Sequence, residues 1–88
     1  MKDKVADFHP WLREAIAEAK SSGLEREASK LEQRAFAAYT TSSELLGETG
    51  DAIREFLHSA GRSVPPTVNK KLRACLAEIG KVWSKFAP

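Results

Sequence analysis

A series of apolar and small residues that repeats at helical spacing dominates the middle of this chain. Successive members lie three or four residues apart, which places them on one face of an α-helix. The series comprises Leu24, Ala28, Leu31, Ala35, Ala38, Ser42, Leu46, Thr49, Ile53, Phe56 and Ala60. Such a face must be shielded from water by other helices or by a second copy of the chain. The sequence therefore predicts an all-α fold in which the remaining segments cover this face.

We expect an up-down helical bundle of about four helices. The predicted helices span residues 7–22, 24–40, 43–60 and 67–86. Pro10 suits the first turn of the first helix, where its missing N–H is not needed, and Gly23 suits the residue that ends it. Pro65 and Pro66 interrupt the chain before the last helix. The short connections favour antiparallel neighbours.

Whether the second and third helices are separate depends on residues 40–43. This Thr-Thr-Ser-Ser segment has poor helix propensity, because its side-chain hydroxyls compete for backbone hydrogen bonds. We therefore expect a break or a sharp bend there. The alternative is a single fused helix from 24 to 60, about 55 Å long at ~1.5 Å per residue. Its exposed seam would be covered by a second copy in a dimeric bundle.

Gly47 and Gly50 lie inside the predicted third helix. Each costs the helix about 1 kcal/mol relative to alanine. Glycine within a helix often lets a neighbouring element approach closely, and this is our interpretation of both residues. The alternative is that they mark a flexible point at which the helix opens.

Composition limits the class of protein. Eighty-eight residues suit one domain, which we assign to 1–88. A content of 42% hydrophobic and 30% charged residues is too apolar for a disordered chain. No apolar run is long enough to span a bilayer or to serve as a signal peptide, so we expect no membrane contact. Cys75 is the only cysteine, which favours the reducing cytoplasm.

Three aromatic residues lie at or beyond the margins of the predicted apolar faces. These residues are Trp11, Phe36 and Trp83. Aromatic side chains are enriched at protein interfaces, so we expect these three at a contact with a partner. The alternative is a wider core face. The leading interpretation is a small, non-enzymatic interaction or structural module that forms a homodimer or binds another helical protein.

Basic residues are concentrated in the last third of the chain. Residues 1–61 contain eight Lys and Arg against eleven Asp and Glu, whereas residues 62–88 contain six against one. The predicted basic patch comprises Lys70, Lys71, Arg73, Lys81 and Lys85. Nucleic-acid binding through this last helix is therefore the alternative function. The net charge of +2 is small for that function.

No residue pattern points to catalysis, a metal or a cofactor, so we do not expect an enzyme. Glu55 and His58 have a Glu-x-x-His spacing that could coordinate a metal ion. A di-iron site, however, needs a second copy of this motif and further carboxylates. Cys75 falls within an apolar helical seam, where a cysteine behaves as a small hydrophobe. The acidic strip of Glu44, Glu48, Asp51 and Glu55 is expected to match basic residues of neighbouring helices.

Overall fold

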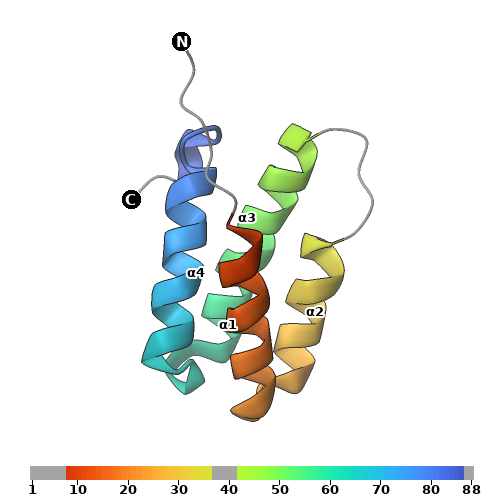
Figure 1. The fold of residues 1–88 in the computed structure, drawn as a ribbon, viewed down its shortest axis with the longest axis vertical. Helices are drawn as coiled ribbons and strands as arrows, with labels where there is room; N and C mark the ends of the chain where they lie inside the picture. The colour runs from red at the N-terminus through yellow and green to blue at the C-terminus, as the bar shows by residue number, and fades with distance from the viewer. Residues whose placement is uncertain (1–7, 37–41, 87–88) are drawn as a thin grey trace.

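The computed structural model describes residues 8–36 and 42–86, and in these two ranges it consists of four α-helices and two short 3₁₀ helices. The elements are α1 (His9–Ser21), α2 (Glu25–Ala35), α3 (Ser42–Ala60), η1 (Gly61–Ser63), α4 (Pro66–Ile79) and η2 (Ser84–Phe86). The predicted all-α, four-helix fold is confirmed. Figure 1 shows consecutive helices running in opposite directions, which is compatible with the expected up-down order.

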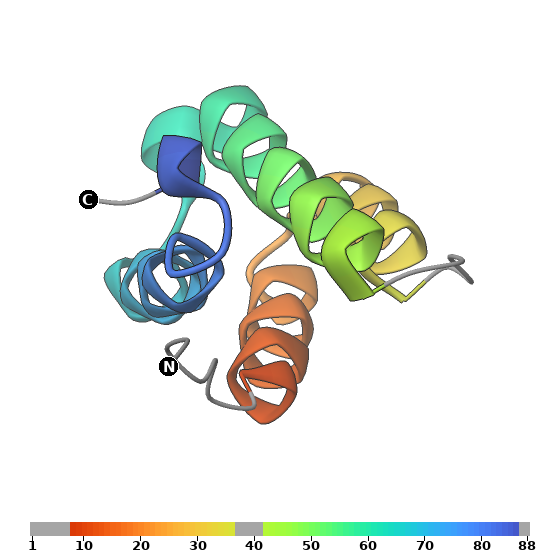
Figure 2. The ribbon, with the colours of Figure 1, turned by 90° about the horizontal axis from the view of Figure 1, so that it is seen from above.

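The four helices surround a single apolar core. Both α1 and α3 pack against α2 and α4, so the helices form a closed ring, which Figure 2 shows from above. The largest fully buried side chains come from α1, α3 and α4: Leu12, Ile53, Val68, Leu72, Cys75 and Ile79. Leu31 contributes from α2 and is 2% exposed. The described part of the apolar series between Leu24 and Ala60 is thus the inner face of α2 and α3.

The fused-helix alternative is wrong. Arg34 near the end of α2 donates hydrogen bonds to Glu48 and Glu55 of α3. In one continuous helix, residues 34 and 55 would lie about 30 Å apart. The two helices instead pack side by side, as Figure 1 shows. The predicted break at 40–43 lies mostly outside the described residues, and α3 begins at Ser42.

Local sequence signals explain where several helices begin and end. Pro10 stands in the first turn of α1, and Pro66 opens α4. Gly23 adopts a positive φ of 92°, so the chain reverses there between α1 and α2 at no steric cost. The second helix ends at Ala35, and the remaining predicted residues 37–40 lie outside the described residues.

The last predicted helix, 67–86, is wrong in its second half. It ends at Ile79, and the chain turns at Gly80 before the 3₁₀ helix η2. A straight helix would carry Phe86 about 10 Å beyond Ile79 along its axis. The turn instead returns Phe86 to α3, where it is 5% exposed and packs directly on Gly50. Burial of this ring outweighs the propensity of residues 80–86 to continue the helix.

The two glycines of α3 allow this close approach, as interpreted from the sequence. Trp83 lies against Gly47, and Phe86 lies against Gly50. The segment that approaches α3 is the turn after α4 rather than a neighbouring helix. Within the two described ranges, no helix has both the length and the apolar character needed to cross a membrane.

Candidate functional site

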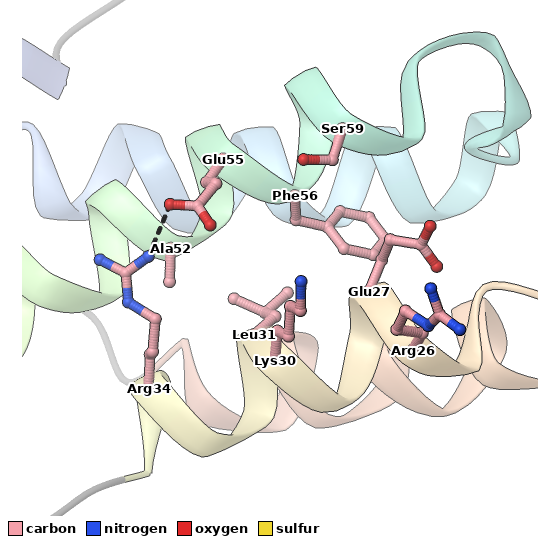
Figure 3. Close-up of a pocket in the computed structure, with 9 residues that line it drawn as sticks. All are labelled: Arg26, Glu27, Lys30, Leu31, Arg34, Ala52, Glu55, Phe56 and Ser59. Atoms are coloured by element: carbon pink, nitrogen blue, oxygen red, sulfur yellow. Dashed lines mark hydrogen bonds and ion pairs between the residues drawn. The ribbon is translucent and has the colours of Figure 1, made fainter.

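Charged side chains line two depressions beside α3. The first, which we call the α2–α3 cleft, has a volume of about 220 Å³. Figure 3 shows its lining residues: Arg26, Glu27, Lys30, Leu31, Arg34, Ala52, Glu55, Phe56 and Ser59. Leu31 and Phe56 lie between the two helices, and charged side chains of both signs surround them. The cleft is small and its charges are mixed.

One cation of the α2–α3 cleft, Arg34, already has two carboxylate partners. Arg34 donates from Nη1 to Glu55 at 2.9 Å and from Nη2 to Glu48 at 3.3 Å. Burial alone would lower the pKa of Arg34, but the two carboxylates outweigh it and raise the pKa. The guanidinium therefore joins α2 to α3, and a ligand would have to compete with both carboxylates for it.

The second depression, which we call the α3–α4 hollow, is larger. Its volume of about 530 Å³ falls within the range of ~300–1,000 Å³ that is typical of ligand sites. Its lining comprises Arg54, Leu57, His58, Arg73, Leu76, Ala77, Lys85 and Phe86. Positions i, i+3 and i+4 share one helix face, so α3 and α4 each present three lining residues toward the other. Lys85 and Phe86 of η2 complete the lining of the hollow.

The lining of the α3–α4 hollow combines basic and apolar side chains. The Cζ atom of Arg54 lies 5.6 Å from the centre of the Phe86 ring, and Nζ of Lys85 lies 5.0 Å from it. Such cation–π contacts help to hold both cations over the ring. Arg73 donates from Nε to Oδ1 of Asn69 at 2.7 Å. No Asp or Glu belongs to the described lining.

Ion pairing separates the cations of the hollow into two groups. Lys85 pairs with Asp51 at 3.4 Å. Among the described residues, no carboxylate forms an ion pair with Arg54 or Arg73. Two arginines from facing helices thus remain uncompensated beside apolar surface. This arrangement suits a negatively charged group attached to an apolar one.

The five residues of the predicted basic patch occupy different surroundings. Arg73 and Lys85 line the α3–α4 hollow. Lys70 and Lys71 instead border a groove between α1 and α4, and Lys71 reaches Glu14 and Glu18 at 3.4 and 3.6 Å. Lys81 pairs with Glu78 at 2.8 Å. The basic composition of the last third of the chain is therefore spread over several surfaces.

Sequence reasoning missed Arg54 and considered His58 only with Glu55 as a possible metal ligand, yet both Arg54 and His58 line the same hollow. Both lie in the acidic part of the chain, where the charge count pointed away from a basic site. Their spacing of four residues on one helix face was the available signal. Which helix this face meets depends on the packing of α3 against α4.

The three aromatic residues predicted at an interface contact different helices. Trp11 borders the α1–α4 groove and is 38% exposed, whereas Trp83 packs on Gly47 of α3 and is 37% exposed. Phe36 is half-buried beside α1, where the Cζ atom of Arg13 lies 4.4 Å from its ring centre. The structure does not gather these side chains into one patch.

Three of the four residues in the predicted acidic strip pair with basic residues of neighbouring elements, as expected. Glu48 and Glu55 pair with Arg34 of α2, and Asp51 pairs with Lys85. Glu55 therefore faces α2, whereas His58 lines the hollow toward α4, so this Glu-x-x-His pair is divided between two surfaces. Within residues 8–36 and 42–86, no group of three His, Cys, Asp or Glu side chains could hold a metal ion.

Cys75 is buried in the core. Its exposed fraction is 0%, and its thiol lies 3.9 Å from the carbonyl oxygen of Phe8. Burial raises the pKa of the Cys75 thiol to about 12. The thiol stays protonated at neutral pH and has no access to a substrate, in keeping with its place in the apolar seam.

Comparison of this chain with protein-family models, with curated proteins and with solved structures found no match.

Proposed function

We propose that this chain is a non-enzymatic protein-interaction module that binds an acidic, partly apolar segment of a partner protein in the α3–α4 hollow. One observation carries the proposal: Arg54 and Arg73 line a hollow that also contains apolar side chains, and neither has a carboxylate partner among the described residues. Guanidinium groups form strong, often bidentate hydrogen bonds with carboxylates. An acidic segment would satisfy both arginines.

The apolar lining supports a segment that also carries hydrophobic side chains. Leu57 and Leu76 are half-buried and lie on facing helices, with Ala77 beside them. A partner side chain placed there would remove apolar surface from water. Because both helices belong to the closed bundle, the site needs little rearrangement, which lowers the entropic cost of binding.

Fluorescence anisotropy tests this proposal. The probe is a labelled twelve-residue peptide of alternating Glu and Leu, and the control peptide has Gln in place of Glu. We expect the acidic peptide to bind at least tenfold more tightly, with an affinity that falls as salt screens the charges. Equal binding of the two peptides would contradict the proposal.

Charge reversal locates the site on the protein. Arg54→Glu and Arg73→Glu are expected to weaken binding at least tenfold each, because each introduces repulsion at the hollow. Lys70→Glu is the matched control, since it makes the same charge change on the exposed side of α4 beside Trp11. The control is expected to change the affinity less than twofold. Circular dichroism verifies that all three variants are folded.

Self-association is part of the proposal, and exposed apolar side chains support it. Trp11, Val82 and Trp83 are the large hydrophobic residues that remain exposed among the described ones. Nucleic-acid binding through α4 is the alternative function. It is less favoured, because the basic residues of the last third of the chain are spread over several surfaces. Titration of duplex DNA at two salt concentrations discriminates, because phosphate contacts weaken steeply with salt. Binding of DNA, but not of the acidic peptide, would favour the alternative.

A further inference from the structure

We infer that the α3–α4 hollow takes a doubly charged oxyanion, and that the partner segment bound there carries a phosphorylated side chain. This inference rests on the proposed function, because it names the chemical group that the partner protein presents. Three observations support it: the uncompensated charge of the hollow, the donors of its two arginines, and the contrast with the α2–α3 cleft.

The uncompensated charge matches a phosphate group better than a carboxylate. Three permanent cations line the hollow, and Asp51 pairs with one of them, Lys85. Arg54 and Arg73 therefore leave two positive charges without a carboxylate among the described residues. A phosphorylated side chain carries a charge of about −1.5 to −2 at pH 7, whereas a glutamate carries only one negative charge. A single phosphate can thus balance both arginines.

The donors of the two arginines also suit a phosphate. Arg73 uses Nε for its hydrogen bond to Asn69, which fixes the guanidinium and leaves its two terminal nitrogens for a ligand. Arg54 is placed over the Phe86 ring and has no hydrogen-bond acceptor among the described residues. Planar guanidinium groups match phosphate oxygens with paired N–H donors. The two arginines come from facing helices and line the same hollow, so we expect them to bind different oxygens of one phosphate.

The α2–α3 cleft shows the opposite arrangement in the same molecule. Arg34 lies between Glu48 and Glu55, and both carboxylates accept hydrogen bonds from it. A phosphate entering the cleft would have to displace these acids and would be repelled by them. The α3–α4 hollow presents arginines without such competitors, so the preference for a dianion belongs to the hollow.

Three peptides that differ at one position test the inference. They are leucine-containing acidic segments with serine, glutamate or phosphoserine at the centre, and anisotropy measures the affinity of each. We expect the phosphoserine peptide to bind at least tenfold more tightly than the serine peptide and several-fold more tightly than the glutamate peptide. Inorganic phosphate alone is expected to bind at least tenfold more weakly than the phosphopeptide, because it makes no apolar contacts.

Variants of the protein test whether the preference for the phosphoserine peptide depends on the α3–α4 hollow. Arg54→Gln and Arg73→Gln are each expected to remove most of the gain from phosphorylation, whereas Lys70→Gln keeps it. Both arginines are exposed, so these variants are expected to fold, and thermal denaturation verifies this. A gain that persists when both arginines are replaced would overturn the assignment to the hollow.

The remaining outcomes separate this inference from the function on which it rests. If serine and phosphoserine peptides bind equally well and charge reversal at Arg54 abolishes both, the inference fails and the proposed function stands. If none of the peptides binds, both fail. If inorganic phosphate binds as tightly as the phosphopeptide, the hollow is a site for a free anion and the partner segment is excluded.

Discussion

The ring of Phe86 occupies the space that a side chain at position 50 would need. A Cβ atom built on Gly50 would lie 2.6 Å from Cζ of Phe86 and 2.7 Å from its Cε2. Carbon atoms in proteins pack at about 3.5–4.0 Å, so these distances do not allow the two groups to coexist. The glycine therefore lets the segment after α4 return to α3, bury Phe86 and contribute to the lining of the α3–α4 hollow.

Gly50→Ala is expected to destabilise the fold. Overpacking in a core costs about 1–3 kcal/mol, which exceeds the gain of up to ~1 kcal/mol from better helix propensity. Urea denaturation measures the free energy of unfolding. Gly47→Ala is the matched control, because its Cβ would lie at an ordinary 3.4 Å from Trp83. We expect that control to be neutral or stabilising, and equal destabilisation by both substitutions would contradict this account.

A double-mutant cycle assigns the clash to Phe86. In a Phe86→Ala background, the atoms that crowd position 50 are absent, so Gly50→Ala is expected to stabilise the helix rather than destabilise it. Phe86→Ala itself is expected to cost about 3–5 kcal/mol, because it removes a buried ring. If Gly50→Ala has the same effect in both backgrounds, its cost comes from another contact.

Replacement of Arg34 is expected to weaken the contact between α2 and α3. Arg34→Met keeps much of the apolar stem but removes the hydrogen bonds to Glu48 and Glu55, and both pairs are partly exposed. We expect a loss of about 1 kcal/mol in the free energy of unfolding, and a smaller loss at high salt. Lys81→Met is the control, because Lys81 pairs with Glu78 only three residues away. An equal effect of both variants would argue against a role in joining helices.

Cys75 is expected to make stability fall at alkaline pH. Burial raises the pKa of its thiol from 9.0 to about 12, so the unfolded chain releases this proton at a lower pH than the folded chain does. The stabilisation is complete below pH 9 and decreases as pH rises toward 12, because deprotonation favours the unfolded state. The difference in unfolding free energy between the natural chain and Cys75→Ala should shrink by about 2 kcal/mol between pH 8 and pH 10.5. A constant difference would show that the thiol titrates normally.

The fold was predictable because its main contacts follow helical periodicity. Leu31 and Ile53 fall on the predicted face and are buried. Gly23 was predicted to end the first helix, and the chain reverses there with a positive φ at this residue. The end of α4 was not predictable in this way. Val82 and Phe86 continue the apolar spacing of the last helix, yet Val82 is 47% exposed and Phe86 is buried against Gly50. That contact joins positions 36 residues apart, and local periodicity carries no information about it.

The candidate site was predictable only in part for the same reason. Arg73 and Lys85 stood out in a basic segment, but Arg54 lies between Asp51 and Glu55, and His58 belongs to the part of the chain with an acidic balance. Packing directs Glu55 toward α2 and His58 toward α4. Acidic and basic side chains that are close together in the sequence of α3 therefore lie on different surfaces. A local charge count cannot reproduce this division, because it depends on which face of α3 each neighbouring helix covers.

Self-association is the last expectation that a direct measurement can decide. Val82 is the most exposed large hydrophobic residue of the described chain, and the partly exposed Trp83 lies next to it. Burial of this pair against a second copy would remove apolar surface from water. Light scattering coupled to size exclusion is therefore expected to give the mass of a dimer at high micromolar concentration.

Substitution at Val82 shows whether this surface forms the contact. Val82→Glu is expected to shift the protein toward the monomer, because it places an unpaired charge in the proposed contact. Ala17→Glu makes the same charge change at an exposed position of α1 and is expected to leave the mass unchanged. Phe36 is half-buried under Arg13, so its replacement should affect stability more than association. A natural chain that is strictly monomeric at this concentration would refute self-association, and a dimer that Val82→Glu leaves intact would assign the contact to another surface.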